Sequence, residues 1–291
     1  MQTTSSAKGL RLVAGATLFW RLSGVFVRWL PGVQPWTFNA YRGLGMALAI
    51  LAWTLWHYRG ETIAMFRRSE PAALLISAGA FALGSSLYIV AMNLSSVAAV
   101  SCLGATSGLF AGVLARVWLG EKTQPVFYVA VLMASGGATV IALGEGEASI
   151  NGYWGTLIGL GVAFCFALQS VSLRRYKALD MEPAMLLGGL GVFGLVAASG
   201  LLVALPLQSV ALLLLMGAVQ LALPLVLYMR GARSVGAVQM VVITMADAVL
   251  NPLWVWLVHG EIPVVGVYWG GTLILLGIGL TTWNGRKLVS A

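Results

Sequence analysis

Two charged side chains, Arg21 and Asp247, lie about midway along apolar segments of the sequence. An arginine or aspartate at the centre of a membrane-spanning helix costs at least about 2.5 to 3.5 kcal/mol, so such side chains face the interior of a helix bundle. Arg21 has the chemistry to hold a carboxylate through two hydrogen bonds, and Asp247 to hold an ammonium group or a proton. Alternatively, the two side chains neutralise each other as a buried pair.

Aromatic and polar side chains at comparable depth are further candidates for binding a small molecule. They are Trp20, Tyr88, Tyr228 and Trp254, together with Ser23, Thr106, Gln169 and Asn251. Ring contacts add about 0.5 to 1.5 kcal/mol beyond burial, so an aromatic wall suits aromatic or apolar ligands. Core packing explains any single ring equally well, and serine or threonine often bonds only its own backbone. Pro224 and Pro252 interrupt helical hydrogen bonding, and we expect them to act as hinges.

Other chemical motifs are weak or absent. Cys102 and Cys165 fall within apolar stretches without the spacing of a metal site, so we interpret them as buried small hydrophobes. Residues 189–194 match G-x-G-x-x-G, but no strand precedes this apolar segment, which excludes a dinucleotide site. His57 and His259 are far apart in sequence, and neither a P-loop nor an H-E-x-x-H sequence occurs. The sequence therefore predicts no catalytic residue, no metal site and no cofactor.

The composition of the chain indicates which kind of secondary structure carries these residues. The chain has 291 residues, of which 59% are hydrophobic and only 9% charged, whereas soluble domains have roughly 45–50% and about 25%. At about 20 residues per crossing, the length accommodates about ten spans and leaves no room for an aqueous domain. We predict an all-α integral membrane protein with ten transmembrane helices. They are placed at residues 10–30, 36–57, 71–92, 96–118, 125–143, 153–173, 183–205, 210–230, 235–258 and 264–283.

The charged residues predict how the chain is oriented in a membrane. Seventeen lysines and arginines against nine acidic residues give a net charge of +8. Because no dense basic run occurs, and because membrane proteins concentrate basic residues in cytoplasmic loops, we assign the excess to orientation and exclude nucleic acid as a partner. Both termini are therefore predicted to be cytoplasmic. The N-terminal apolar stretch lacks a small-residue cleavage site, so we expect it to be a first span and not a signal peptide.

A weak internal repeat divides the predicted spans into two halves, residues 1–145 and 146–291. At an offset of 140 residues, Leu87-Tyr88 aligns with Leu227-Tyr228, Gly120-Glu121 with Gly260-Glu261 and Gly137 with Gly277; at an offset of 146, Gly9 aligns with Gly155 and Gly15 with Gly161. Each half holds five spans, an odd number, so the second half enters the membrane from the opposite side. Inverted repeats of this kind support alternating access around a site at the midplane, which indicates a transporter.

Two further kinds of charged residue are interpreted as structural. Arg42 lies about two turns into its predicted span, and from that depth a long side chain can reach the headgroups. Glu121 and Glu261 each follow a glycine at the end of a span. Because both halves have this glutamate, we favour a turn contact that stabilises the fold over a catalytic role.

The arrangement of the spans and a few short motifs carry a family resemblance. Each half ends with Gly-Glu and one more span, and an arginine lies early in the second span, in Trp36-Thr-Phe-Asn-Ala-Tyr-Arg42. With these features the chain resembles the drug/metabolite transporter superfamily, and within it the ten-helix EamA-type exporters. Residues 18–31, which include Leu-Phe-Trp and Arg-Trp-Leu-Pro, are most similar to the aromatic and amino-acid exporter branch.

This resemblance implies a central cavity lined by spans 1, 3, 4, 6, 8 and 9, with spans 5 and 10 packed as a pair. Asp247 matches an acidic residue that is common in the family. Gly108 and Ala248 stand where the family often has proline, and Arg21 stands where it usually has a small residue. The resemblance also implies export as the direction of transport.

We therefore expect a secondary transporter or facilitator of the cell inner membrane that exports amino acids with aromatic or apolar side chains. A first alternative is export of other metabolites or drugs, such as nucleotide sugars or organic cations. Alternatives of other classes are an integral-membrane enzyme acting on a lipid-linked substrate and an ion channel. The expected partners are a small-molecule substrate and the lipid bilayer, with no obligate protein partner.

Overall fold

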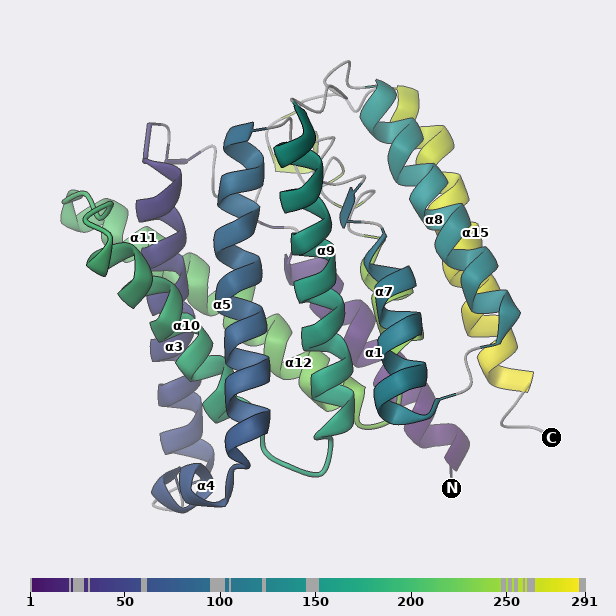
Figure 1. Ribbon diagram of the computed structural model, residues 1–291, viewed down its shortest axis with the longest axis horizontal. Coiled ribbons are helices and arrows are strands. Elements are labelled where there is room, and N and C mark those ends of the chain that lie inside the picture. The colour runs from purple at the N-terminus through teal and green to yellow at the C-terminus, as the bar shows by residue number, and fades with distance from the viewer. Residues whose placement is uncertain are drawn as a thin grey trace.

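The computed structural model describes residues 2–20, 22, 29–30, 32–58, 62–94, 103–104, 106–121, 124–144, 152–246, 250, 253, 256–258, 260 and 265–287. Within these ranges the regular elements are helical (Figure 1), as predicted. They are α1 (Gln2–Trp20), α3 (Pro35–Tyr58), α4 (Thr62–Arg68), α5 (Pro71–Leu94), α7 (Ser107–Leu114), the π-helix η1 (Ala115–Leu119), α8 (Pro125–Gly144), α9 (Gly152–Arg175), α10 (Glu182–Ala198), α11 (Leu207–Met216), the π-helix η2 (Gly217–Ala222), α12 (Leu223–Ala232), α13 (Ala237–Thr244) and α15 (Val265–Lys287).

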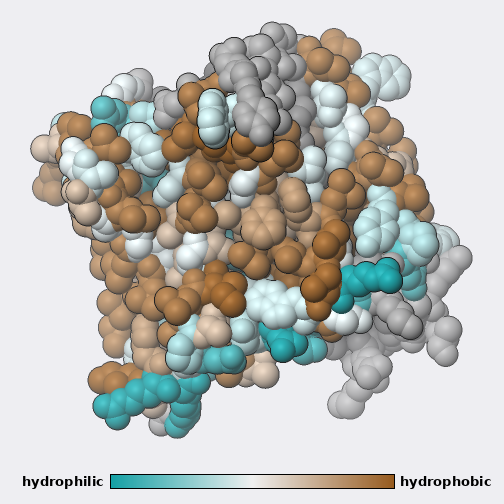
Figure 2. All heavy atoms as spheres, in the orientation of Figure 1, coloured by the Kyte–Doolittle hydropathy of each residue, from teal (hydrophilic) through white to brown (hydrophobic). Residues whose placement is uncertain are grey.

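Several of these helices have the length and composition of membrane spans. Among the described residues, three stretches are long and apolar enough to cross a bilayer: Pro71–Ala91, Leu157–Arg175 and Leu207–Ala232. Shorter apolar helices are Ser107–Leu119, Pro125–Ile141, Glu182–Ala198 and Val265–Leu280. Apolar side chains cover much of the visible face, and hydrophilic ones gather along its lower edge (Figure 2).

One end of the bundle, which we name the basic end, carries arginines from α4 and from the ends of α9 and α12. They are Arg67, Arg68, Arg174, Arg175, Arg230 and Arg233. Helix α1 begins at this end and α15 finishes there (Figure 1). Because α3 and α12 also end there, while α10 begins there, neighbouring helices run up and down the bundle.

Proline and glycine determine where many of these helices start and stop. Pro35, Pro71 and Pro125 are the first residues of α3, α5 and α8, a position where the missing N–H has no helical partner to lose. Gly120 follows η1 with a φ of 67°, and Gly200 follows the end of α10 with a φ of 71°. Glycine adopts this left-handed conformation without a steric cost, so it ends a helix cleanly.

Some helix ends differ from the apolar pattern. Helix α1 begins at Gln2 and ends at Trp20, although the apolar stretch predicted a span over 10–30. Helix α10 ends at Ala198 and not at 205, because the left-handed Gly200 ends the helix. Helix α7 begins at Ser107, and Leu103 and Gly104 before it are also helical, whereas the predicted start at 96 lies outside the described residues. Thr106 donates from Oγ1 to the Leu103 carbonyl at 2.6 Å, and this local bond competes with helical hydrogen bonding.

Apolar side chains form two main cores. The first joins α1, α3, α10 and α12, and the fully buried Met46, Met185 and Leu225 lie within it. The second joins α7, α8, α9, α13 and α15, around residues such as Val131, Val241 and Ile274. Helix α9 contributes to both cores, with Leu173 in the first and Val171 in the second.

Equivalent helices of the two sequence halves make equivalent contacts. A Cβ atom at Gly15 of α1 would lie 3.8 Å from Leu227 Cδ1 of α12, and one at Gly161 of α9 would lie 3.2 Å from Leu87 Cδ1 of α5. Gly15 and Gly161 align at the offset of 146, and Leu87 and Leu227 at the offset of 140. The packing of α1 on α12 is therefore repeated by α9 on α5.

Glycines also bring α8 and α15 together along their length. A Cβ at Gly137 would overlap the carbonyl of Gly270, and one at Gly277 would lie 2.9 Å from the carbonyl of Ala130. These contacts make α8 and α15 antiparallel neighbours, so the predicted pairing of spans 5 and 10 is confirmed. Since Gly137 aligns with Gly277 at the offset of 140, and Ala130 with Gly270, the two contacts are equivalent to each other.

Two glycine-rich stretches of the sequence, Gly104, Gly108 and Gly112 at four-residue spacing and the G-x-G-x-x-G segment, allow close helix packing. Cβ atoms at Gly108 and Gly112 of α7 would approach Val131 and Tyr128 of α8 at 2.6 and 3.0 Å, whereas one at Gly104 would meet nothing within 4 Å. The G-x-G-x-x-G segment lies inside helix α10, where a Cβ at Gly189 would lie 2.5 Å from the Gly43 carbonyl of α3. Both motifs allow close helix contacts, and the exclusion of a dinucleotide site agrees with the helical backbone.

Candidate functional site

Three rings meet where α1 ends. The ring of Trp20 lies 5.1 Å from that of Tyr228 on α12 and 6.3 Å from that of Phe166 on α9, measured between ring centroids. Phe166 and Tyr228 are 6.5 Å apart. We name Trp20, Phe166 and Tyr228 the aromatic cluster, and each comes from a different helix.

Hydrogen bonds fix two members of the aromatic cluster. Ser170 Oγ donates to the Phe166 carbonyl at 2.8 Å and lies 2.9 Å from the Tyr228 hydroxyl. Because the single Ser170 proton is already used, the Tyr228 hydroxyl is the donor to Ser170. Gln220 Nε2 donates to the Trp20 carbonyl at 2.7 Å and so holds the end of α1 against η2. Gln220 Oε1 is buried and has no partner in the described part of the chain.

Pro224 accounts for the π-helical turn that precedes α12, the helix that carries Tyr228. It lies near the start of α12 and is buried. It has no N–H to donate to the carbonyl four residues earlier, and the chain directly before it is the π-helix η2, in which the Leu223 N–H reaches back to the Ala218 carbonyl. Such wide turns occur frequently at functional sites. Its predicted role as a hinge stays a prediction.

A second group of polar side chains joins α3 to α5. Arg42 Nη2 donates to Asn39 Oδ1 at 2.9 Å, and Ser85 Oγ donates to the same oxygen at 2.8 Å. Asn39 Nδ2 in turn donates to the Ser85 carbonyl at 3.3 Å. We name Asn39, Arg42 and Ser85 the polar cluster. Arg42 is half-buried and bonds Asn39 of its own helix, while its predicted reach toward the headgroups stays a prediction.

The other predicted site residues are separate from the aromatic cluster or lie outside the described residues. Thr106 bonds the Leu103 carbonyl in the turn before α7, and Gln169 Nε2 donates to Met185 Sδ of α10 at 3.3 Å. Tyr88 lies on α5, one turn from Ser85 of the polar cluster. The remaining predicted residues, Arg21, Ser23, Asp247, Asn251, Pro252 and Trp254, lie outside the described residues, as does Cys102. Cys165 is buried, as predicted.

Sequence reasoning missed Phe166 and Ser170, although a signal for one of them was present. Phe166 follows Trp20 by 146 residues, the offset that aligns Gly15 with Gly161. Applying the repeat to Trp20 therefore identifies Phe166 as its equivalent. Ser170 carries no such mark, because a serine inside an apolar helix most often bonds its own backbone.

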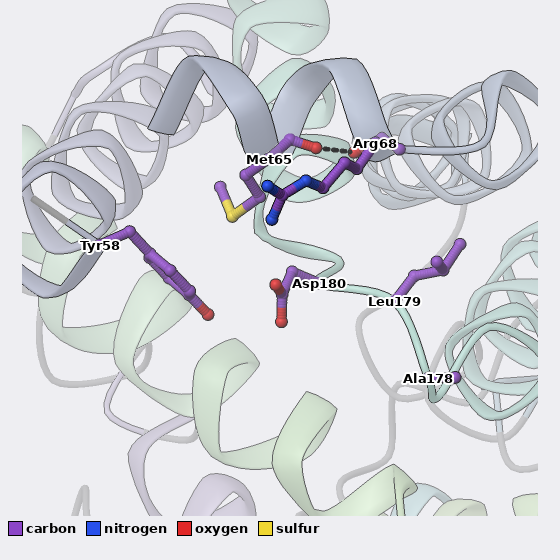
Figure 3. Close-up of a pocket in the computed structure, with 7 residues that line it drawn as sticks. Tyr58, Met65, Arg68, Ala178, Leu179 and Asp180 are labelled. Atoms are coloured by element: carbon purple, nitrogen blue, oxygen red, sulfur yellow. Dashed lines mark hydrogen bonds between the residues drawn. The ribbon is translucent and has the colours of Figure 1, made fainter. Parts of the chain in front are cut away.

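A pocket of about 180 Å³ opens at the basic end between α3, α4 and the segment that precedes α10. In Figure 3 the Tyr58 ring, the Arg68 guanidinium and the Asp180 carboxylate extend into the same space. Burial, together with the charges of Glu182 and Asp180, raises the pKa of Tyr58 to about 12. Asp180 is also paired with Arg233 at 3.2 Å. Since ligand pockets usually measure 300 Å³ or more, we do not assign the substrate to this pocket.

Arg174, at the end of α9, joins the ends of η1 and α12 at the basic end. Its Nε lies 3.0 Å from Glu121 Oε1, just after η1, and its Nη1 donates to the Ala232 carbonyl at the end of α12 at 2.9 Å. The prediction that Glu121 makes a structural contact at a turn agrees with this geometry. Among the residues that the structure describes, no group of three His, Cys, Asp or Glu side chains is placed to bind a metal.

Comparison with known proteins gives one family and one fold. Residues 7–143 match the EamA-like transporter family. A solved structure titled "Crystal structure of protein" is similar over 97% of this chain and 99% of its own, with a TM-score of 0.84 and 18% sequence identity. At that identity the likeness establishes the fold alone. No curated protein matches the sequence.

Proposed function

We propose that this chain exports amino acids with aromatic or apolar side chains, because residues 7–143 match the EamA-like transporter family, whose members move small molecules across membranes. The observation that carries the choice of substrate is the aromatic cluster. It combines a ring from the end of α1 with rings from α9 and α12. Substrate rings gain about 0.5 to 1.5 kcal/mol per aromatic contact beyond burial, which favours aromatic amino acids over small polar ones.

We further propose ten spans in two inverted halves that exchange conformations during transport. The repeated glycine contacts of α1 with α12 and of α5 with α9 support this proposal, because the two pairs are equivalent at the sequence offsets. The arginines of the basic end favour a cytoplasmic position for that end in the inner membrane. There the Arg174 contacts with Glu121 and Ala232 hold helix ends together.

The experiment is counterflow in proteoliposomes with a panel of aromatic, apolar and charged amino acids, a nucleotide sugar and an organic cation. We expect tryptophan and phenylalanine to exchange fastest. Trp20→Ala removes one ring of the proposed aromatic wall and should slow tryptophan exchange about tenfold. The matched control is Trp269→Ala, because Trp269 on α15 is 71% exposed.

Two results would contradict the proposal, the first its substrate class and the second the place of the site. Exchange of only the organic cation would favour that alternative substrate, since aromatic rings also bind cations. Equal tryptophan exchange by Trp20→Ala and by the unmodified protein would show that the aromatic cluster does not bind the substrate. Energy coupling is tested in the same vesicles by collapsing the pH gradient, because a proton-coupled exporter slows whereas a facilitator does not.

A further inference from the structure

Arg42 is half-buried and holds a positive charge partway along α3, away from both helix ends. It lies seven residues after Pro35 in α3, a helix of 24 residues, which places it about 10 Å from the first residue and about 24 Å from the last. A charge at such depth in a membrane protein is costly and usually marks a functional site.

The described partners of Arg42 carry no negative charge. Its Nη2 donates to Asn39 Oδ1, its guanidinium lies 5.9 Å from the centre of the Phe38 ring, and its buried Nε has no partner among the described residues. The acidic residues of the described ranges lie at the basic end; they are Glu70, Glu121, Asp180 and Glu182. Within the described part of the chain, the Arg42 charge is therefore not neutralised.

The surroundings hold Arg42 in place. Asn39 is 1% exposed, and Ser85 of α5 bonds both ends of its amide. This fixes the oxygen that accepts from Arg42. On the other side, a Cβ at Gly217 of η2 would overlap the Arg42 carbonyl, so the backbone of α3 packs tightly there.

The polar cluster and the aromatic cluster meet the same helical segment. Gly217 of η2 approaches Arg42, and Gln220, three residues later, bonds the Trp20 carbonyl. Both contacts are made by backbone carbonyls, so η2 joins the backbone of α3 at Arg42 to the end of α1 at Trp20.

We propose that Arg42 binds the carboxylate of the transported substrate. A guanidinium with a buried and unused Nε–H matches the planar geometry of a carboxylate, and charge-assisted hydrogen bonds are the stronger kind. The substrate thereby supplies the negative charge that the described residues do not. This inference rests on the proposed function and adds to it the group that recognises the acid.

The test separates a binding role from a structural role by removing the carboxylate from the substrate. Counterflow of tryptophan is compared with that of tryptophanamide, which lacks the carboxylate, and of indole-3-propionate, which keeps it without the ammonium group. In the unmodified protein we expect tryptophan to exchange faster than tryptophanamide. Arg42→Gln should slow tryptophan and indole-3-propionate tenfold or more and change tryptophanamide less than twofold. Arg42→Lys, which keeps the charge without the planar fork, should give an intermediate loss.

Arg230→Gln is the matched control, because the Arg230 guanidinium lies over the Trp53 ring at 5.3 Å, near the basic end. It should change none of the three rates. If a variant does not reconstitute, the shift of its melting temperature by each ligand in detergent replaces the rate. Equal losses for all three compounds in Arg42→Gln would overturn the proposal in favour of a structural role. No exchange of any amino acid by the unmodified protein would instead overturn the proposed function, and this inference with it.

Discussion

The Ser170 hydroxyl connects the aromatic cluster to the backbone of α9. It accepts from the Tyr228 hydroxyl and donates to the Phe166 carbonyl, so one small side chain orients rings from two helices. Tyr228 is 1% exposed, which means that its hydroxyl has no access to water if Ser170 is removed. Removing the Ser170 hydroxyl therefore leaves the buried Tyr228 hydroxyl without a partner, whereas removing the Tyr228 hydroxyl leaves Ser170 still bonded to the Phe166 carbonyl.

We predict that Ser170→Ala destabilises the protein more than Tyr228→Phe does. The first leaves a buried hydroxyl unpaired and should cost about 1 to 3 kcal/mol, whereas the second removes the donor and should cost about 1 kcal/mol or less. The double variant should recover part of the Ser170→Ala loss. Denaturant unfolding of the purified variants in detergent measures the three values. A larger loss for Tyr228→Phe would contradict the assignment of Tyr228 as donor.

At the scale of the elements, the pairing of α8 with α15 depends on positions without a side chain. Gly137 and Gly270 face each other so closely that a Cβ on either would overlap the other carbonyl. Gly136, next to Gly137, has nothing within 4 Å of the position of a Cβ. Neighbouring glycines of one helix thus have opposite structural requirements.

Gly137→Ala should lower stability by about 1 to 3 kcal/mol, because the helices must separate to admit the methyl group. Gly136→Ala should be neutral or stabilising by up to about 1 kcal/mol, since alanine favours a helix more than glycine does. Thermal unfolding of the two variants in the same detergent makes the comparison. Equal melting temperatures would show that the α8–α15 contact does not limit stability.

Helix identity and several contacts between elements were predictable from the sequence, but some ends were not. Apolar segments indicated the helices, and the offset of 146 correctly related Gly15 to Gly161 in their packing. The end of α1 at Trp20 was not predictable, because the apolar pattern continues past it and Gln220, 200 residues later in the chain, bonds its carbonyl. The repeat could have identified Phe166, whereas no periodicity reveals the hydrogen bonds by which Arg42 and Ser85 share the Asn39 amide oxygen.

For the whole molecule, the arrangement predicts opposite labelling of its two ends. Lys8 in α1 and Ser199 after α10 are both exposed. Lys8 lies at the basic end, and Ser199 lies at the opposite end. With the native cysteines replaced by alanine, Lys8→Cys should react with a membrane-impermeant thiol reagent only in inverted membranes, and Ser199→Cys only in intact cells. Reaction of both cysteines from the same side would contradict the proposed orientation.

The contact between Gly43 of α3 and Gly189 of α10 has a further consequence. The two residues are 146 apart, so the repeat maps this pair onto itself. If the two halves exchange conformations as proposed, pairs of neighbours take over the geometry of their equivalents, but a helix pair that is its own equivalent keeps its geometry. We therefore expect the crossing of α3 and α10, like the pairing of α8 with α15, to stay fixed while the contacts of α1 with α12 and of α5 with α9 interchange.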